Sequence, residues 1–375
     1  MTSCDFLRSF DVRNPRIGTT REEWAPHAAM SAKTFEWWYM TTYLHDDLGN
    51  AYFYFLCLSA FQGEAYQRNV TGRTAPEGTT VLSIASLFSH YASERVWPSM
   101  RVPFTPTDSL FDPSSNCVRV DAGDGTNVSW SFGQDAMKLS HNTSEGVSLE
   151  AAITGLDTVL WHQDHAGEKH GIEGFIQQGA EDDFSFYYSL PRAHLTGTLT
   201  LPSEAGAPAK RSVSGRAWID RQWGDFATLF WEWSSFRFQS GASVHIYNFY
   251  NGHQEAVYQD ADGGVHRLKD KVIVRQNGYV KSPNIGNWVS WGWTYEFPIE
   301  IEGSRRFTVK PFGARDFMEY PTLQTQVPVQ LNGYGLFEGA GALIDDETGN
   351  VVGVSINESA DIRAMQNGPY EKNQN

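Results

Sequence analysis

The spacing of apolar residues is the feature that most constrains this fold. From residue 99 to residue 150, and through much of the second half, short alternating runs such as 118–120, 128–132 and 147–150 are separated by turn-forming residues. No helical period extends beyond about three turns. Alternation with a period of two residues is typical of strands with one buried face. We therefore predict an all-β chain of antiparallel barrel or sandwich domains.

The length of 375 residues is enough for roughly two domains. The stretch 203–209 is the best internal break, because it consists of small and polar residues with Pro and Gly, and we interpret it as the boundary. The prediction is an N-terminal β domain over 1–202, with 1–30 as a lead-in arm, and a C-terminal β domain over 210–375. In the first domain, strands at 35–40 and 52–58 are expected to be joined by a turn at 46–50.

Charge and composition exclude several classes of partner. The formal charge of −15 is unfavourable for binding nucleic acid or an anionic membrane surface. No run of about 18 apolar residues is present, so we expect no membrane span. The N-terminus lacks the pattern of a signal peptide and the three cysteines are sparse, which predicts a cytoplasmic protein. Thirteen Trp, sixteen Tyr and twenty-three Phe fit β structure and also a large apolar cavity.

The stretch 215–225 is a strand that ends in a cluster of Trp and Asp residues. Strand alternation places Arg216, Trp218 and Asp220 on one face. Poor solvation beside the indoles would raise the pKa of Asp220 and make it a proton donor. In the alternative interpretation, Asp220 is ionised, is paired with Arg216 or Arg221, and holds the strand end in place. The sequence leaves both open.

Two further acids lie among aromatic residues. Glu36 and Trp38 share one face of a predicted strand, whereas Trp231 and Trp233 lie on the face opposite Glu232. Aromatic faces near acids can stabilise a substrate cation. Ordinary core packing is the other interpretation.

Two polar sets could orient a substrate. Tyr188, Arg192 and His194 are expected to alternate onto one face of a strand, and His245 and Tyr247 onto one face of another. Either set could instead be the wetter face of an antiparallel sheet.

No cofactor or metal is expected. Residues 161–170 contain several His and acidic residues, but their spacing matches no strand face or helical turn, so we interpret them as a solvated loop. There is no Gly-rich phosphate loop after a strand and no Gly-x-Ser-x-Gly elbow.

Four motifs occur in order: Glu-Trp-Trp-Tyr at 36–39, Tyr-Tyr-Ser-x-x-Arg at 187–192, Gly-x-x-Trp-x-Asp-x-x-Trp-Gly at 215–224 and Phe-Glu-Gly-Ala at 337–340. Together they resemble the AttH/CrtC-like family, the lipocalin-like group that contains the carotenoid 1,2-hydratases (hydroxyneurosporene synthases). The resemblance covers roughly 35–360. It implies two consecutive lipocalin-like antiparallel β-barrel or sandwich domains, a ligand cavity, and chemistry without a redox cofactor.

The resemblance also implies a range of activities. Carotenoid hydratases protonate a terminal double bond and add water. Similar proteins of fungal natural-product clusters catalyse cationic epoxide rearrangements, cyclisations or (hetero-)Diels–Alder reactions. Members of the family often carry His directly after the Asp of the third motif, where this chain has Arg221. That difference disfavours a mechanism that needs this histidine, and with it carotenoid hydration.

The leading hypothesis is a cofactor-independent isomerase or cyclase of secondary metabolism that acts on a hydrophobic prenylated or polyene molecule. Asp220 would donate the proton, with Glu36 and Glu232 as further candidates. The residues predicted to enclose or orient the substrate are Trp38, Trp218, Trp223, Trp231, Trp233, Tyr188, Arg192, His245 and Tyr247. The alternatives are a Diels–Alderase that relies on pocket shape, a carotenoid-type hydratase, and a non-enzymatic lipocalin-like carrier.

Overall fold

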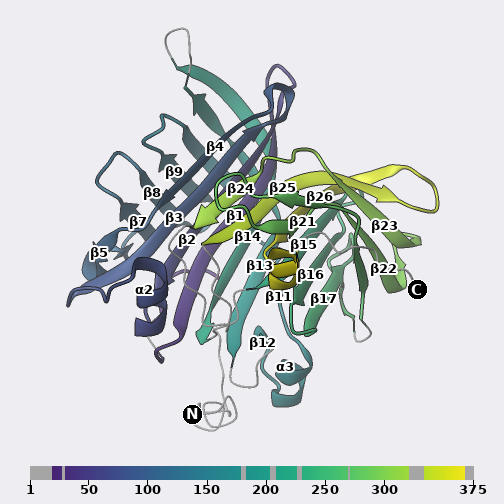
Figure 1. Ribbon diagram of the computed structural model, residues 1–375, viewed down its shortest axis with the longest axis horizontal. Helices are drawn as coiled ribbons and strands as arrows, with labels where there is room; N and C mark the ends of the chain where they lie inside the picture. Colours follow the sequence, from purple (N-terminus) through teal and green to yellow (C-terminus); the bar gives the residue numbers. More distant parts are fainter. Residues whose placement is uncertain are drawn as a thin grey trace. The chain divides into compact units, whose positions relative to one another are not determined.

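The computed structural model describes residues 19–27, 30–178, 183–202, 208–225, 230–268, 271–320 and 333–367. Most of their regular structure is antiparallel β-sheet (Figure 1), and the predicted all-β class is confirmed. Contacts divide the chain into unit 1, Met1–Trp161 with Phe184–Phe226, and unit 2, His162–Asp183 with Ala227–Asn375.

The division differs from the domain boundary expected from sequence. Most of the stretch 203–209 lies outside the described residues. The strand that follows it, β14 (Ala209–Asp225), pairs with two strands of unit 1 and therefore belongs to that unit. Residues 162–183, expected in the N-terminal domain, are grouped with unit 2.

One antiparallel sheet forms most of unit 1. Its strand order is β4-β3-β2-β1-β14-β13-β10-β9-β8-β7-β6, with β5 on β3 and β11 on β13. The bounds are β1 (Thr34–Asp46), β2 (Ala51–Phe61), β3 (Thr79–His90), β4 (Arg95–Arg101), β5 (Phe104–Pro106), β6 (Phe111–Asp112), β7 (Cys117–Asp121), β8 (Asn127–Phe132), β9 (Met137–Asn142), β10 (Ser148–Thr154), β11 (Leu160–Trp161), β13 (Phe184–Leu201), β14 (Ala209–Asp225) and helix α2 (Glu64–Thr71).

The turn expected at 46–50 joins β1 to β2. The Asp46 carboxylate accepts hydrogen bonds from the backbone N–H groups of Leu48 and Asn50. Gly49 has a φ of 81°, a conformation that glycine adopts without strain. The turn therefore fixes the register of the hairpin that begins the sheet.

The unit 1 sheet curls around one of its faces. The Tyr54 hydroxyl on β2 lies 3.1 Å from His141 Nδ1 on β9, although four strands separate β2 from β9 in the sheet. Near the N-terminus, Trp24 packs edge-on against Trp130 of β8, with ring centroids 4.9 Å apart. Since Trp24, Trp130 and His141 are fully buried, this inner face encloses an aromatic core.

Unit 2 is built around a second antiparallel sheet of order β18-β17-β16-β15-β26-β25-β23-β22-β19, with β24 on β25 and a separate pair, β20-β21. The bounds are β12 (Phe175–Gln177), β15 (Trp231–Phe238), β16 (Ser243–Phe249), β17 (Gln254–Gln259), β18 (Val265–Arg267), β19 (Ile273–Gln276), β20 (Tyr279–Lys281), β21 (Trp288–Ser290), β22 (Trp293–Ile301), β23 (Ser304–Pro311), β24 (Phe317–Tyr320), β25 (Tyr334–Asp345), β26 (Val351–Ser359), α3 (His165–His170) and α4 (Ile362–Asn367).

This second sheet also curls. Phe236 on β15 contacts the rings of Tyr295 and Phe297 on β22, at centroid distances of 4.9 Å and 6.1 Å, although three strands lie between β15 and β22 in the sheet. The face that carries Phe236 is therefore the inner face of unit 2.

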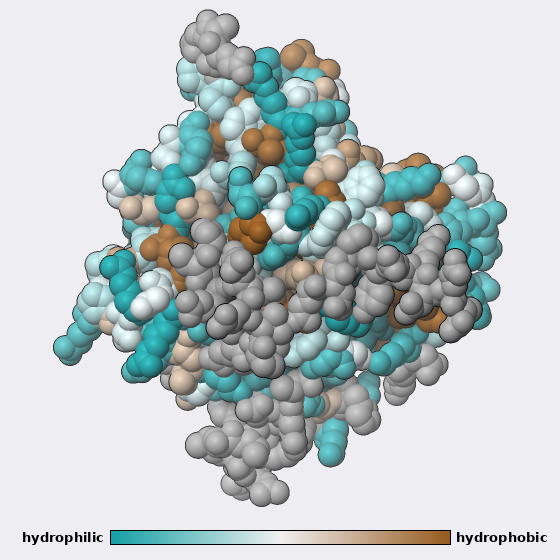
Figure 2. Space-filling view, in the orientation of Figure 1, coloured by the Kyte–Doolittle hydropathy of each residue, from teal (hydrophilic) through white to brown (hydrophobic). Residues whose placement is uncertain are grey.

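The visible surface is mainly hydrophilic. In Figure 2 the apolar residues form small, separate patches among polar ones. Large apolar side chains that are exposed to solvent include Leu48 and Val351. Among the described residues, no helix is both long and apolar enough to cross a bilayer.

Candidate functional site

The predicted acids of unit 1 lie on opposite faces of its sheet. Glu36 is the cross-strand partner of Trp223 on one face, and Asp220 is the partner of Tyr39 on the other. Trp218 lies on the Asp220 face, as strand alternation predicts. Asp220 and Glu36 therefore belong to two separate clusters.

Both carboxylate oxygens of Asp220 accept hydrogen bonds from described residues. Tyr187 donates to Oδ2 at 2.9 Å, while Ser189 and Trp218 donate to Oδ1 at 2.5 Å and 2.6 Å. The side chain is 3% exposed. Donors to both oxygens stabilise the ionised carboxylate and so act against proton donation. The alternative pairing with Arg221 is not formed, because Arg221 lies on the other face.

Glu36 forms a buried ion pair with Arg221 on the inner face. Arg221 Nη2 donates to Glu36 Oε2 at 2.5 Å, and both side chains are almost fully buried. Burial alone would raise the pKa of Glu36, but the charge of Arg221 and the hydrogen bond from His27 bring it below its usual value. Glu36 is therefore ionised near neutral pH and is not a proton donor.

His27 is a member of this cluster that sequence reasoning missed. Its ring stacks on Trp223 at 4.3 Å, with 3° between the planes. Nδ1 lies 3.1 Å from Glu36 Oε2 and 3.0 Å from Arg221 Nη2, and Nε2 lies 2.8 Å from Glu23. The segment before β1 thus places His27 beside Arg221, the residue that directly follows the Asp of the third motif.

Arg221 also explains how the N-terminal segment is held. It donates hydrogen bonds to the backbone oxygens of Glu23 and Ala25. Its guanidinium lies 4.0 Å from the centroid of the Trp38 ring and 5.5 Å from that of Trp223. Two of the indoles predicted to stabilise a substrate cation therefore already contact a protein cation.

The predicted grouping of Tyr188, Arg192 and His194 is wrong. Tyr188 is the partner of Arg221 on the inner face, whereas His194 is the partner of Arg216 on the Asp220 face. The pairing shifts by one residue between Leu190 and Ala193, which is a β-bulge. An extra residue in one strand reverses every later side chain. Tyr188 instead donates a hydrogen bond to the backbone oxygen of Thr20.

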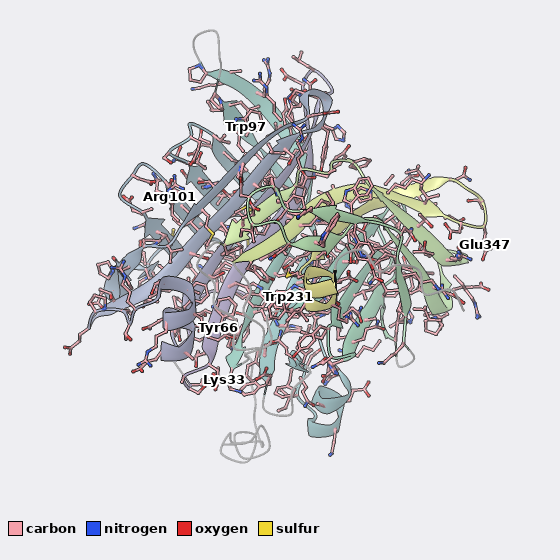
Figure 3. All side chains as sticks on the ribbon, viewed as in Figure 1. Lys33, Tyr66, Trp97, Arg101, Trp231 and Glu347 are labelled. Carbon is pink, nitrogen blue, oxygen red and sulfur yellow. The ribbon has the colours of Figure 1, made fainter. Side chains whose placement is uncertain are left out.

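In unit 2, Glu232 lies on the opposite face of β15 from Trp231 and Trp233, as predicted. It shares the inner face with Phe236. Trp231, the first residue of β15 (labelled in Figure 3), donates its indole N–H to Glu358 at 2.9 Å. These two tryptophans therefore do not enclose the Glu232 carboxyl.

Glu232 differs from the other two acids in its charge state. The side chain is 2% exposed. Oε2 accepts a hydrogen bond from Gln276 at 2.8 Å, but Oε1 has no hydrogen-bond partner among the described residues, nor has Nε1 of the neighbouring Trp293. Burial raises the pKa of Glu232, and the negative charge of Asp361 adds to the rise, while the polar side chains of Ser290, Gln276 and Trp293 oppose it without cancelling it. Glu232 is thus the predicted acid best placed to carry a proton.

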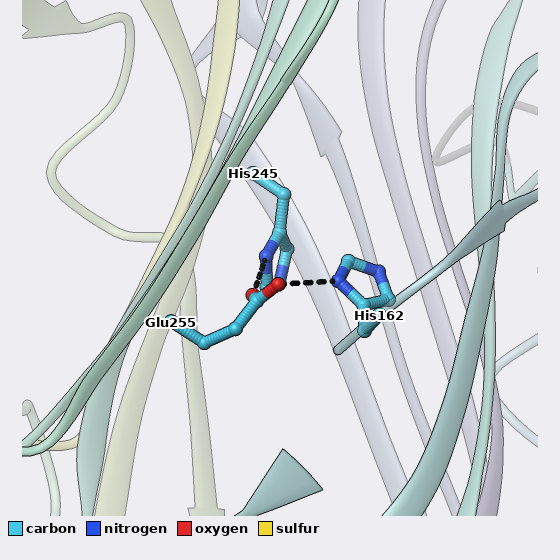
Figure 4. Close-up of side chains that lie close together, drawn as sticks. All are labelled: His162, His245 and Glu255. Atoms are coloured by element: carbon cyan, nitrogen blue, oxygen red, sulfur yellow. Dashed lines mark hydrogen bonds and ion pairs between the residues drawn. The ribbon is translucent and has the colours of Figure 1, made fainter. Parts of the chain in front are cut away.

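A third cluster lies on the other face of the unit 2 sheet. His245 and Tyr247 share this face, as predicted, with Trp233. Glu255 contacts His245 Nδ1 at 2.7 Å and His162 Nδ1 at 3.2 Å (Figure 4). Burial lowers the pKa of His162 to about 4, so the ring is neutral at pH 7. Two imidazoles and a carboxylate are common metal-ligand types.

The interpretation of 161–170 as a solvated loop is wrong, because part of this stretch is buried and part is helical. His162 is fully buried, and 165–170 forms the short helix α3, with Asp164 accepting a hydrogen bond from Gly167 N at its start. Sequence spacing could not reveal the cluster, because Glu255 lies 93 residues from His162. For His27, the only indication of a role in a site was its place in the polar lead-in arm. Nothing in the sequence pattern pointed to Gln276 or Trp293.

Comparisons with known proteins agree with this architecture. The family model described as AttH-like matches residues 22–349. The structure is similar to that of an AttH protein from Nitrosomonas europaea, with a TM-score of 0.62 and 16% identity over 87% of this chain and 92% of that chain. It is also similar to kievitone hydratase from Nectria haematococca, with a TM-score of 0.57 and 15% identity over 86% and 88% of the two chains.

A search of curated proteins found no match. The two solved structures have the lipocalin-like fold that the motifs predicted. Since the family model spans most of the chain, the protein belongs to the AttH-like family.

Proposed function

We propose that this protein is an enzyme that protonates a hydrophobic small molecule without a redox cofactor, and that Glu232 is the proton donor. One observation carries the proposal: a buried carboxyl with a raised pKa whose Oε1 has no hydrogen-bond partner among the described residues. A buried polar atom without a partner is rare unless a ligand or water completes it. A carboxylic acid kept neutral by its surroundings is the usual means of acid catalysis near pH 7.

The reaction begins with transfer of the Glu232 proton to an alkene carbon or an epoxide oxygen of the substrate. The resulting carbocation reacts with an internal double bond or hydroxyl group, which gives an isomer or a ring. Loss of a proton from the product returns the proton to the Glu232 carboxylate, so no net change in redox state occurs. The Trp293 ring beside the carboxyl would stabilise the cation. Acid catalysis of this kind contributes about 10²–10⁴-fold.

Hydration is the second candidate. Its first step is the same, but water captures the cation. The structural similarity to kievitone hydratase favours this outcome. Glu36, whose pKa is lowered, and Asp220, whose two oxygens accept hydrogen bonds, are not assigned the role of acid in either case.

The test uses wild type, Glu232→Gln, Asp220→Asn and, as a matched surface control, the exposed Glu300→Gln. Each is incubated with prenylated, epoxide and polyene compounds in water enriched in oxygen-18, and the products are analysed by mass spectrometry. We expect Glu232→Gln to lose about 10²–10⁴-fold in rate, with the control unchanged. The wild-type rate should fall as pH rises through the raised pKa of Glu232, since only the protonated acid donates.

The product mass separates the candidates. An unlabelled isomer supports cyclisation or isomerisation, and a product heavier by labelled water supports hydration. Turnover by a folded Glu232→Gln at the wild-type rate would contradict the proposed acid and favour a Diels–Alderase acting through pocket shape. Binding without turnover by the wild type would favour the carrier.

A further inference from the structure

Three buried side chains converge in unit 2 outside the proposed acid site. His162 follows directly after β11 in the chain, His245 lies on β16 and Glu255 on β17. Figure 4 shows both imidazole rings directed at the carboxylate. Their ligand atoms all lie within 4.8 Å of one another, and all three side chains are at least nine-tenths buried.

The sheet fixes two of the three groups. His245 is the cross-strand partner of Val257, so Glu255, two residues away, is its diagonal neighbour on the same face. Side chains on paired strands are more accurately positioned than those on loops. The third group, His162, approaches from a separate segment, and its ring centroid lies 4.2 Å from that of His245.

The distances suit a small metal ion. Zinc binds imidazole nitrogen and carboxylate oxygen at about 2.0–2.2 Å, which puts the ligand atoms of a tetrahedral ion roughly 3.4 Å apart. His245 Nδ1 lies 2.7 Å from Oε2 of Glu255 and His162 Nδ1 lies 3.2 Å from Oε1, and the ligand atoms of the three residues all lie within 4.8 Å of one another. The three groups must therefore rearrange around an ion, but none has to come from a distant part of the unit. A divalent ion would also compensate the buried negative charge of Glu255.

We propose that His162, His245 and Glu255 form a binding site for a divalent transition-metal ion of the zinc class. Two histidines and one carboxylate leave a fourth position for water or a ligand oxygen. Imidazole nitrogens favour zinc and its neighbours over magnesium or calcium. The site lies on the opposite face of the sheet from Glu232, so the proposal does not depend on the proposed function.

The full-length protein is stripped of metal with a chelator, dialysed, and titrated with CoCl₂. We expect one equivalent of Co²⁺ to bind, with the intense visible absorption of a four- or five-coordinate ion, and ZnCl₂ to displace it. The melting temperature should rise with excess Zn²⁺, because the ion binds only the folded state. A wild type that shows neither stoichiometric binding nor this absorption overturns the proposal and leaves a hydrogen-bonded His–Glu–His group.

The variants Glu255→Gln and His245→Gln are compared with His266→Gln, an exposed histidine of the same unit. Loss of a ligand should weaken Co²⁺ binding by at least about tenfold and abolish the absorption, whereas the control keeps both. Circular dichroism verifies that each variant is folded. If Glu255→Gln retains the wild-type spectrum, the ion binds elsewhere and the proposal fails. If a variant does not fold, the Co²⁺ titration of the wild type alone decides whether the metal site exists.

Discussion

At the scale of single residues, three buried acids have three different environments. Asp220 accepts hydrogen bonds on both oxygens, Glu36 pairs with a guanidinium, and Glu232 has one oxygen without a partner among the described residues. Burial is nearly equal for all three, so burial does not set their charge state. Hydrogen bonds and neighbouring charges do. This is why a sequence pattern of acids among aromatic residues could name the candidates but not rank them.

The Glu36–Arg221 pair predicts a large effect on stability. In Glu36→Gln, Arg221 stays buried without a compensating charge, which costs about 3–5 kcal/mol in the free energy of unfolding. Urea unfolding followed by circular dichroism measures the loss. The double variant Glu36→Gln/Arg221→Met should recover part of it, since neither charge is then buried.

The exposed pair Arg275–Glu296 provides the control for this prediction. Its atoms are 3.0 Å apart, but both side chains are about half exposed. Glu296→Gln should therefore cost no more than about 1 kcal/mol. Equal losses in Glu36→Gln and Glu296→Gln would show that the buried pair contributes no more than a surface pair.

At the scale of elements, alternation predicted the strand faces wherever pairing is regular. Trp218 and Asp220 share a face, Glu232 opposes its flanking indoles, and His245 aligns with Tyr247. The prediction failed at Tyr188 and His194 because β13 carries one extra residue between Leu190 and Ala193. Pro191 inside this strand is a signal of irregular pairing, but strict alternation did not take it into account. Contacts between distant strands, such as His162 with Glu255, depend on how the sheet curls, which no local pattern encodes.

The end of β14 depends on a glycine. A Cβ atom at Gly224 would lie 2.2 Å from the backbone oxygen of Phe184 on β13, well inside contact distance. Gly224→Ala must therefore separate β14 from β13 at this end of the pair, at a cost of about 1–3 kcal/mol or more. Thermal unfolding measures this loss, and the exposed Ser212→Ala on the same strand should leave stability within about 0.5 kcal/mol. A Gly224→Ala variant as stable as Ser212→Ala would mean that the strands can separate at no cost.

At the scale of the whole molecule, two opposing effects set the response to acid. The chain carries a formal charge of −15 at pH 7 and has a pI near 5.1, so acidification lowers its self-repulsion. Against this, burial lowers the pKa of His141 to about 3, from an ordinary value of 6.5. Below pH 6.5 the unfolded chain therefore binds a proton that the folded protein does not.

Because only the unfolded chain binds this proton at His141, acidification destabilises the folded protein. As the pH falls from about 6.5 towards about 3, stability is lost through His141 at a rate of about 1 kcal/mol per pH unit. Glu36, whose pKa is lowered, acts in the same direction: its stabilisation is present above pH 4.5 and is lost as pH falls through its folded-state pKa. We expect maximum stability well above the pI.

The predicted loss of stability in acid is measured by calorimetric melting of the wild type and His141→Asn between pH 4 and pH 8. The variant lacks the buried group that titrates. The variant is expected to be less stable at pH 7.5, where it loses packing and the contact with Tyr54, but its stability should fall less steeply below pH 6.5. His266→Gln, at an exposed histidine, should keep the wild-type slope. Parallel curves for the wild type and His141→Asn would show that the folded protein admits a proton at His141, and that the closed inner face of unit 1 opens to water before the protein unfolds.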